Sequence, residues 1–258
     1  MLIRPALVTL TSLAAVATAT LISGPAADAS VARPASHVTA TDRNWVGYAA
    51  LGTRFRYVQA EFRVPKADCA RTPGSQAEPA QASAWVGLDG IFDKSVEQDG
   101  VAATCTDGAA SYNAWLEAWP QANQIEFYPR AGDVIRASVY YSDGDYRLVL
   151  NDLTSGQGFD RVAACGAAEC ANKTAEVVTE DPEVYGSPGR YWPMVDYGTS
   201  DFWDIKITSQ AGLKGNFDTA AWQNSQITMV DPSRHVMAVP ASLAGNGTSF
   251  QTYWKREY

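Results

Sequence analysis

Residues 134–150, VIRASVYYSDGDYRLVL, contain the clearest structural signal in the chain. Two runs rich in β-branched and aromatic residues flank a polar tetrapeptide whose centre is Asp143-Gly144. An Asp-Gly pair between two such runs favours a tight hairpin, because glycine tolerates the positive φ that the turn requires. The stretch therefore predicts two antiparallel strands, at 134–141 and 146–150, joined by a short turn.

Similar β-forming runs extend over most of the chain. Residues 55–64, FRYVQAEFRV, show partial period-2 alternation. Turn signals such as Pro73-Gly74 and Gly245-Asn246-Gly247 separate the runs, and helical patterns are scarce. We therefore predict an all-β fold, an antiparallel sandwich or barrel. The remaining predicted strands lie at 44–50, 83–88, 111–119, 174–179, 203–208, 226–230 and 248–254.

The composition excludes several classes of function. Of the 258 residues, 46% are hydrophobic, so a sizeable core can form. The net charge is −8 and only 19% of the residues are charged, which leaves no basic surface for nucleic acid. The chain has two histidines, His37 and His235, and neither an HExxH nor a G-x-S-x-G motif. Any chemistry must therefore depend mostly on carboxylates, amides and hydroxyls, and we expect no metal and no cofactor.

The N-terminal residues 1–29 have the features of a secretory signal peptide. Arg4 precedes an apolar run, and Ala27-Asp28-Ala29 offers a cleavage site. A membrane anchor is the alternative, but the run is shorter than the roughly 20 apolar residues that a span needs. We expect a secreted, extracellular protein with no membrane attachment after signal cleavage. Residues 30–43 are small and polar, so we expect a flexible mature N-terminus or a pro-segment remnant, followed by a single domain over 44–258.

Four cysteines, Cys69, Cys105, Cys165 and Cys170, fit an exported protein, because an even number allows complete pairing. Three pairings are possible. Cys165 and Cys170 enclose a short loop and would pair locally, and Cys69 and Cys105 would then connect two loops around the segment that contains Gln98. A zinc site with four cysteine ligands is a weaker alternative, because C-x-x-C spacing is absent.

One predicted strand, at 111–119, has two chemically different faces. Residues two apart in a strand share a face. Asn113, Trp115, Glu117 and Trp119 therefore form a wide aromatic and polar face, suited to the floor of a binding cleft. The opposite face is mostly small and apolar, as expected of a row that points to the core. A core position for the aromatic row is the alternative.

A second strand, at 174–179 and the residues that follow, carries two carboxylates, Glu176 and Glu180, on one face. Two carboxylates on one face are unusual for a buried strand, and we interpret them as catalytic candidates. A solvated strand face is the alternative interpretation.

Four segments together resemble the glutamic peptidases, the eqolisin family. Residues 44–47 are similar to the family's early N-W-x-G strand. Residues 85–90 are similar to its W-V-G-I-D-G motif, which a catalytic glutamine follows, here Gln98. Residues 112–120 resemble its Y-D-A-W-Y-E-W-Y-P stretch, and 175–181 resemble A-E-[FW]-I-[IV]-E-D, whose second glutamate is catalytic. The resemblance covers nearly all of 44–258, in the same order.

The resemblance implies a fold and a site. The fold would be an antiparallel β-sandwich of two packed, curved sheets, a concanavalin-like jelly roll. The catalytic pair would be Gln98 and Glu180 on the concave face. Glu180 would activate a water, and Gln98 would orient the water and stabilise the oxyanion, with no covalent intermediate. The expected binding or supporting residues around the pair are Trp45, Trp85, Asp89, Asn113, Glu117 and Trp119.

The function implied is that of a secreted acid endopeptidase. An unperturbed glutamate has a pKa of about 4.3, so both of its protonation states are populated in acid. The expected partners are protein or peptide substrates, and we expect a monomer. Two alternatives remain. In a secreted glycosidase, Glu117 and Glu180 would flank the glycosidic bond and Gln98 would be dispensable. In a non-catalytic module, the same cleft would only bind carbohydrate or peptide.

Overall fold

A computed structural model of the protein describes residues 36–72, 78–92, 95–166 and 170–256. The predicted signal peptide lies outside these residues. Residues Arg33–Tyr258 form one compact unit. Its elements are β1 (Ser36–Asp42), β2 (Trp45–Leu51), β3 (Phe55–Arg63), β4 (Ala80–Asp89), β5 (Val96–Thr106), β6 (Ala109–Ala118), β7 (Gln124–Phe127), β8 (Val134–Ser142), β9 (Asp145–Asp152), β10 (Gly158–Ala164), β11 (Ala175–Glu180), β12 (Thr199–Ser209), β13 (Lys214–Gly215), β14 (Gln223–Val230), β15 (Val236–Pro240), the 3-10 turn η1 (Gly245–Gly247) and β16 (Phe250–Trp254).

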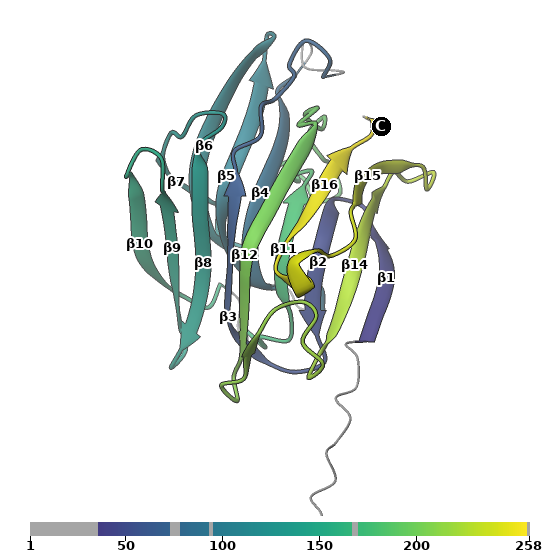
Figure 1. The fold of residues 1–258 in the computed structure, drawn as a ribbon. Helices are drawn as coiled ribbons and strands as arrows, with labels where there is room; N and C mark the ends of the chain where they lie inside the picture. The colour runs from purple at the N-terminus through teal and green to yellow at the C-terminus, as the bar shows by residue number, and fades with distance from the viewer. Residues whose placement is uncertain (1–35, 73–77, 93–94, 167–169, 257–258) are drawn as a thin grey trace, which may run out of the picture. The chain divides into compact units, whose positions relative to one another are not determined.

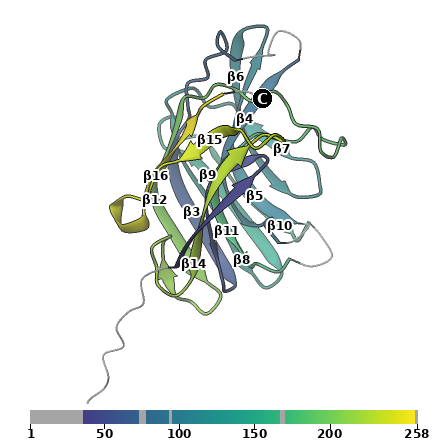
Figure 2. The same ribbon diagram turned by 90° about the vertical axis from the view of Figure 1, so that its right-hand side faces the viewer.

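The strands form one hydrogen-bonded path that folds over into two packed layers (Figures 1 and 2). The path runs β10-β9-β8-β3-β12-β16-β15-β14-β2-β11-β4-β5-β6-β7. One layer contains β10, β9, β8, β3 and β12. The other contains β14, β2, β11, β4, β5, β6 and β7, while β16 and β15 connect the two layers. Apolar side chains from both layers form one core, for example Phe62 and Leu148 against Val86 and Val177. The predicted all-β sandwich is confirmed.

Every stretch predicted as a strand overlaps a strand of the structure. The hairpin between β8 and β9 has Asp143 at φ 56° and Gly144 at φ 97°, as a turn matched to the strand twist requires. Strands β1, β5, β7, β10, β13 and β15 were not predicted. Strand β5, VEQDGVAATCT, lacks a hydrophobic pattern because it places Glu97 and Asp99 in the interior and small residues elsewhere.

The predicted flexible segment at 30–43 differs from the structure over residues 36–42. Residues Ser36–Asp42 form β1, which pairs in parallel with β14 from Ser36 opposite Gln223 to Asp42 opposite Met229. Its side chains are exposed, so the sequence has no alternation of buried and exposed positions that would predict a strand there. The backbone pairing with β14 orders it, helped by the β-forming residues Val38, Thr39 and Thr41. Residues 30–35 lie outside the described part of the chain.

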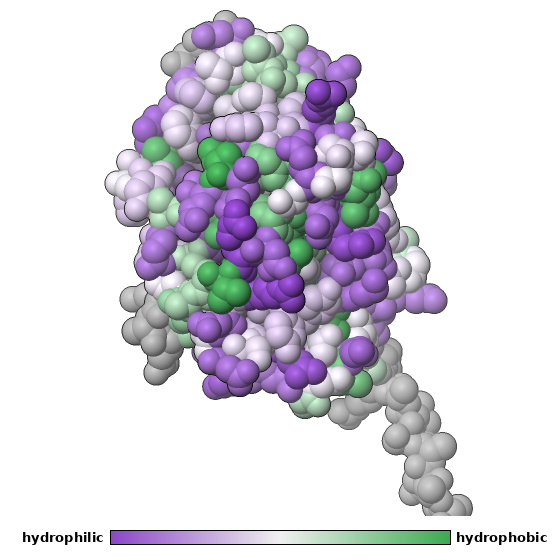
Figure 3. Space-filling model, turned by 90° about the vertical axis from the view of Figure 1, so that its left-hand side faces the viewer, coloured by the Kyte–Doolittle hydropathy of each residue, from purple (hydrophilic) through white to green (hydrophobic). Residues whose placement is uncertain are grey.

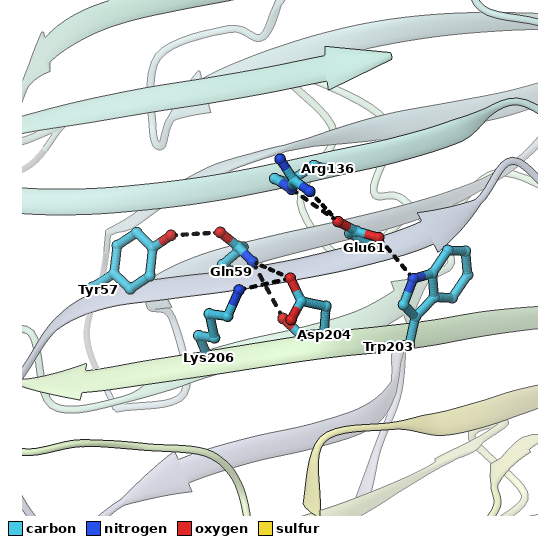
Figure 4. A network of polar contacts seen from close by, with 7 residues as sticks. All are labelled: Tyr57, Gln59, Glu61, Arg136, Trp203, Asp204 and Lys206. Carbon is cyan, nitrogen blue, oxygen red and sulfur yellow. Dashed lines mark hydrogen bonds and ion pairs between the residues drawn. The ribbon is translucent and has the colours of Figure 1, made fainter. Parts of the chain in front are cut away.

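The outer face of the layer that contains β3, β8 and β12 has a self-contained polar network on these three strands (Figure 4). Arg136 and Trp203 both donate to Glu61, the indole at 2.8 Å. Gln59 donates to Asp204 at 2.9 Å, and Lys206 pairs with the same carboxylate at 2.7 Å. These groups satisfy one another on the face that points away from the core.

Both predicted disulfides are present, Cys69–Cys105 and Cys165–Cys170. The alternative of a zinc site with four cysteine ligands is therefore wrong, because all four sulfurs are in disulfides. Cys105 lies one residue before the end of β5, the strand that contains Gln98, so the first disulfide connects the loop before β4 to β5.

The edge strands β7 and β10 approach each other where the two layers end. Arg161 of β10 pairs with Glu126 of β7 at 2.6 Å, and Phe127 contacts Phe159. On the side toward β10, small apolar areas interrupt a mostly hydrophilic surface (Figure 3). In the described part of the chain, no helix is long and apolar enough to span a membrane.

Strand β5 places two carboxyls in the interior between the layers. Glu97 and Asp99 are both fully buried. Burial raises the pKa of Glu97 to about 7, although the backbone N–H of Gly166 donates to its carboxyl group and lowers the pKa in part. Burial also raises the pKa of Asp99 well above its ordinary value. The folded state therefore holds both groups in the protonated form more strongly than the unfolded chain does.

We expect stability to fall as the pH rises. Below the ordinary glutamate pKa of 4.5 both states are protonated and Glu97 has no effect. Between pH 4.5 and about 7, Glu97 ionises in the unfolded chain but not in the folded protein, and this difference favours unfolding. The loss at Glu97 is about 3 kcal/mol, taking 1.36 kcal/mol per pKa unit. Urea unfolding from pH 4 to 8 should show at least this decrease, and Glu97→Gln should remove about that much of it. An unchanged slope in Glu97→Gln, equal to that of the exposed control Asp145→Asn, contradicts this account.

Candidate active site

A cleft of about 850 Å³ lies on the outer face of the layer that contains β11. Its volume is in the range of ligand and substrate sites. Four carboxyl side chains line it, and none of its described lining residues is Lys, Arg or His. Tryptophan and tyrosine side chains form much of the remaining wall. The carboxyl groups belong to Asp42, Glu117, Glu180 and Glu183.

Strand pairing brings Gln98 and Glu117 together. Gln98 of β5 is the register partner of Glu117 of β6, and its Nε2 donates to Glu117 Oε2 at 2.7 Å. Gln98 is 5% exposed, and its Oε1 has no hydrogen-bond partner among the described residues. One amide hydrogen and the amide oxygen of Gln98 thus have no partner among the described residues, and Gln98 lines the cleft.

Glu180, at the end of β11, is surrounded by N–H donors. It is the register partner of Trp45 in β2 and of Ser83 in β4. Its Oε1 accepts from Asn44 Nδ2 at 2.8 Å and from Trp45 Nε1 at 3.1 Å. Its Oε2 accepts from Trp85 Nε1 at 2.7 Å. Three N–H donors hold the carboxyl group in one orientation.

Glycines make room for Trp85. Gly100 of β5 pairs with it, and a Cβ at Gly100 would lie 2.5 Å from the Trp85 Cβ. Real Cβ contacts are essentially never this short, so any larger residue at Gly100 would displace the tryptophan. Trp85 is fully buried below Glu180, and it packs edge-on against Trp45 with ring centroids 4.9 Å apart. The indole N–H that Glu180 accepts is therefore rigidly placed.

Burial strongly affects two of the cleft carboxyls, Glu180 and Glu117. Burial, together with the proximity of Glu117, raises the pKa of Glu180 to about 8, although the N–H donors Trp45 and Trp85 lower it. Burial likewise raises the pKa of Glu117 to about 7, with the Gln98 hydrogen bond lowering it. The sequence analysis expected an unperturbed glutamate pKa, and this expectation is wrong for Glu180 because its carboxyl group is buried in the wall of the cleft.

Most of the predicted site residues meet in this cleft. Besides Gln98 and Glu180, the residues Trp45, Asn113, Glu117 and Trp119 line it. Trp85 lies under the wall and reaches the site through its N–H. Glu176, the other carboxylate of the strand, is fully buried and does not line the cleft.

The structure places Asp89 elsewhere, so its expected place beside the catalytic pair is wrong. Alternation along β4 puts residue 89 on the face of Trp85, but Asp89 has φ 69°, which redirects its side chain. Its carboxylate accepts the backbone N–H groups of Asn172 at 2.6 Å and Lys173 at 2.7 Å. Asp89 thereby positions the start of β11, which ends at Glu180.

Asn44 is a site residue that the sequence analysis did not select. It precedes β2, and its side chain donates to Glu180. Its presence in the N-W-x-G segment was a usable signal, since the neighbouring Trp45 was selected from the same motif. Asp42 Oδ1 accepts the backbone N–H groups of Asn44 at 2.9 Å and Trp45 at 3.0 Å, and so orients both donors.

Comparison with known proteins identifies relatives of this chain. Residues 43–246 match the Peptidase A4 family. Aspergillopepsin-2 of Aspergillus niger is 27% identical over 201 residues, which cover 71% of this chain and 70% of that protein. Scytalido-glutamic peptidase, solved with a peptide-based transition state analog, is 25% identical with a TM-score of 0.69. SCP-B, an eqolisin solved with the tripeptide Ala-Ile-His, is 25% identical with a TM-score of 0.68. Each of these two structures matches 83% of this chain and 99% of its own.

The geometry at Glu180 predicts the effect of removing one N–H donor. The Trp85 N–H stabilises the ionised form of Glu180 by donating to Oε2. Trp85→Phe deletes this donor, so the pKa of Glu180 should rise by about one unit. Carbon-13 NMR titration of the glutamate carboxyl carbons, with the signal assigned by its loss in Glu180→Gln, measures the change. Trp203→Phe, which removes an indole donor from Glu61 instead, is the matched control. An unchanged or lower pKa of Glu180 in Trp85→Phe would disprove this role.

Proposed function

This chain belongs to the peptidase A4 family of glutamic peptidases, and we propose that it is a secreted acid endopeptidase whose catalytic residues are Gln98 and Glu180. It is a glutamic-type peptidase by family and by fold. One observation supports the assignment of the pair above all. Glu180, held by three N–H donors, and Gln98, with a free amide oxygen, line the same cleft.

Each catalytic part has a group that suits it. Glu180 takes a proton from a water as the water oxygen attacks the scissile carbonyl carbon. The amide N–H of Gln98 that Glu117 does not accept donates to the developing oxyanion, and its Oε1 orients the water. Glu180 then passes the proton to the departing nitrogen as the C–N bond breaks. Glu117 is a positioning residue, because it fixes the Gln98 amide through the 2.7 Å hydrogen bond.

Two effects set the working pH. The ionised form of Glu180 activates the water, and burial raises its pKa to about 8, so this form becomes more abundant as the pH rises. The interior carboxyls have no effect on stability where they are protonated in both the folded and the unfolded state, and they lower it at higher pH, where the unfolded chain ionises. Stability therefore favours acid, whereas only a small fraction of Glu180 is ionised there, so the two effects act in opposite directions. We propose work in acid from the resemblance to the family and from this stability.

The relatives favour peptides over the alternative ligands. Scytalido-glutamic peptidase binds a peptide-based analog and SCP-B binds a tripeptide. We infer peptide or protein substrates for this chain, a monomeric state and secretion. A glycosidase that uses Glu117 with Glu180 would leave Gln98 without a part, and a non-catalytic module would show no hydrolysis.

The test is an assay of denatured protein substrate at acidic and neutral pH. Gln98→Ala removes the oxyanion donor and should reduce kcat by about 100- to 1,000-fold. Glu180→Gln removes the base and should abolish measurable turnover. Gln157→Ala and Glu126→Gln, both outside the cleft, are matched controls that should retain activity. Circular dichroism checks that all variants fold.

Two outcomes would overturn the assignment: a wild type that cleaves no protein in acid, or either catalytic variant with full activity. Hydrolysis of an oligosaccharide that survives in Gln98→Ala would support the glycosidase instead. Pepstatin should have little effect, because the site contains no proposed aspartate pair.

A further inference from the structure

Strand β1 precedes the residues that match the family, which begin at 43. It nevertheless forms part of the cleft, since Val38 and Ala40 line it. The parallel register places Val38 beside Ser225 and Ala40 beside Ile227, and these partners line the cleft as well. β1 and β14 lie side by side in both ribbon views (Figures 1 and 2). Strand β1 therefore contributes to the cleft wall although it lies ahead of the residues that match the family.

Two hydrogen bonds and an acidic turn hold β1 in place. His37 Nδ1 lies 2.8 Å from Asn224 Oδ1, and Gln223 Nε2 donates to Ser36 Oγ at 3.1 Å. At the other end, Asp42 accepts the backbone N–H groups that begin β2. The strand is thus anchored at both ends to elements of the cleft.

Apolar side chains gather where β1 meets β14, β2 and the loop after β4. Leu51 and Ile227 belong to one small buried cluster, and Ile91 packs against it. Val38 and Phe92 line the same cleft and are 36% and 62% exposed. Exposed apolar side chains over a buried apolar floor favour the binding of an apolar group, because binding removes their surface from water.

This apolar area adjoins the catalytic carboxyl through Trp45. The Trp45 ring packs against the cluster of Leu51 and Ile227, and its Nε1 donates to Glu180. The register places Val38 beside Ser225, which is opposite Ala49, four residues along β2 from Trp45. A peptide cleaved at Glu180 therefore reaches the apolar area with a side chain several residues from the scissile bond, not with the residue next to it. Arg and Lys are absent from the described lining residues, so no cation is present there to attract an acidic side chain.

We propose that β1 completes an apolar subsite, built with Leu51, Ile91, Phe92 and Ile227, that binds an apolar side chain of the substrate several residues to one side of the scissile bond. The proposal rests on the proposed peptidase function. It makes Val38 a specificity-determining residue and requires that the active enzyme retains β1. The substrate class is then peptides with a leucine-like or aromatic side chain at one position several residues from the cleaved bond.

The test uses the full chain and a set of peptides that differ at single positions around one cleavage site. At the position bound by the subsite, a Leu peptide should exceed an Asp peptide in kcat/KM by at least about 10-fold, as apolar pockets typically discriminate. Val38→Asp places a charge at the exposed wall and should reduce the Leu:Asp ratio by about 10-fold at that position alone. Val162→Asp, an equally polar change at an exposed site of β10, should leave the ratio unchanged.

Separate outcomes decide the subsite and the peptidase function. If no peptide is cleaved, the proposed function fails. If peptides are cleaved in a Glu180-dependent way but no position favours Leu, or Val38→Asp leaves every ratio unchanged, only the subsite is disproved. Phe92→Ala, at an exposed loop residue, should weaken the same ratio and confirm the site without disturbing the core. Mass spectrometry of the active enzyme should find an N-terminus before Val38, and one after it would overturn the proposal.

Discussion

The placement of the Glu180 carboxyl among three N–H donors is the constraint on which the rest of the site depends. A carboxylate taken out of water is unstable unless hydrogen bonds replace its hydration. The donors come from β2, from the residue before it and from β4, so the site exists only when β2, β11 and β4 pair in this register. A shift of one residue would turn Glu180 to the opposite face.

The layer that contains β11 serves the core and the cleft at once. In β5, Gln98 faces the cleft while Glu97 and Asp99 face the interior. In β6, Glu117 faces the cleft while Ala114 and Leu116 pack in the core. Because successive side chains point to opposite faces, packing of the core fixes which residues reach the substrate. Core stability and catalytic geometry are therefore coupled along each strand.

The acidic character of the chain has two separate physical uses. Interior carboxyls on β5 make stability depend on pH, because their ionisation in the unfolded chain at higher pH favours unfolding. Cleft carboxyls provide the proposed base and the group that positions Gln98. A net charge of −8 and two histidines, by themselves, only excluded other chemistries.

The sequence by itself determined the strand class, the turn at Asp143-Gly144 and the segments that carry Gln98 and Glu180, because alternation, turn residues and motif order are local properties. Asp89 shows where that approach ends, since a positive φ overrides the alternation. The pairing register, the donor Asn44, the raised pKa of Glu180 and the addition of β1 to the cleft were decided only by the tertiary structure. Each depends on contacts between residues far apart in the chain, and burial and hydrogen bonding are properties of those contacts.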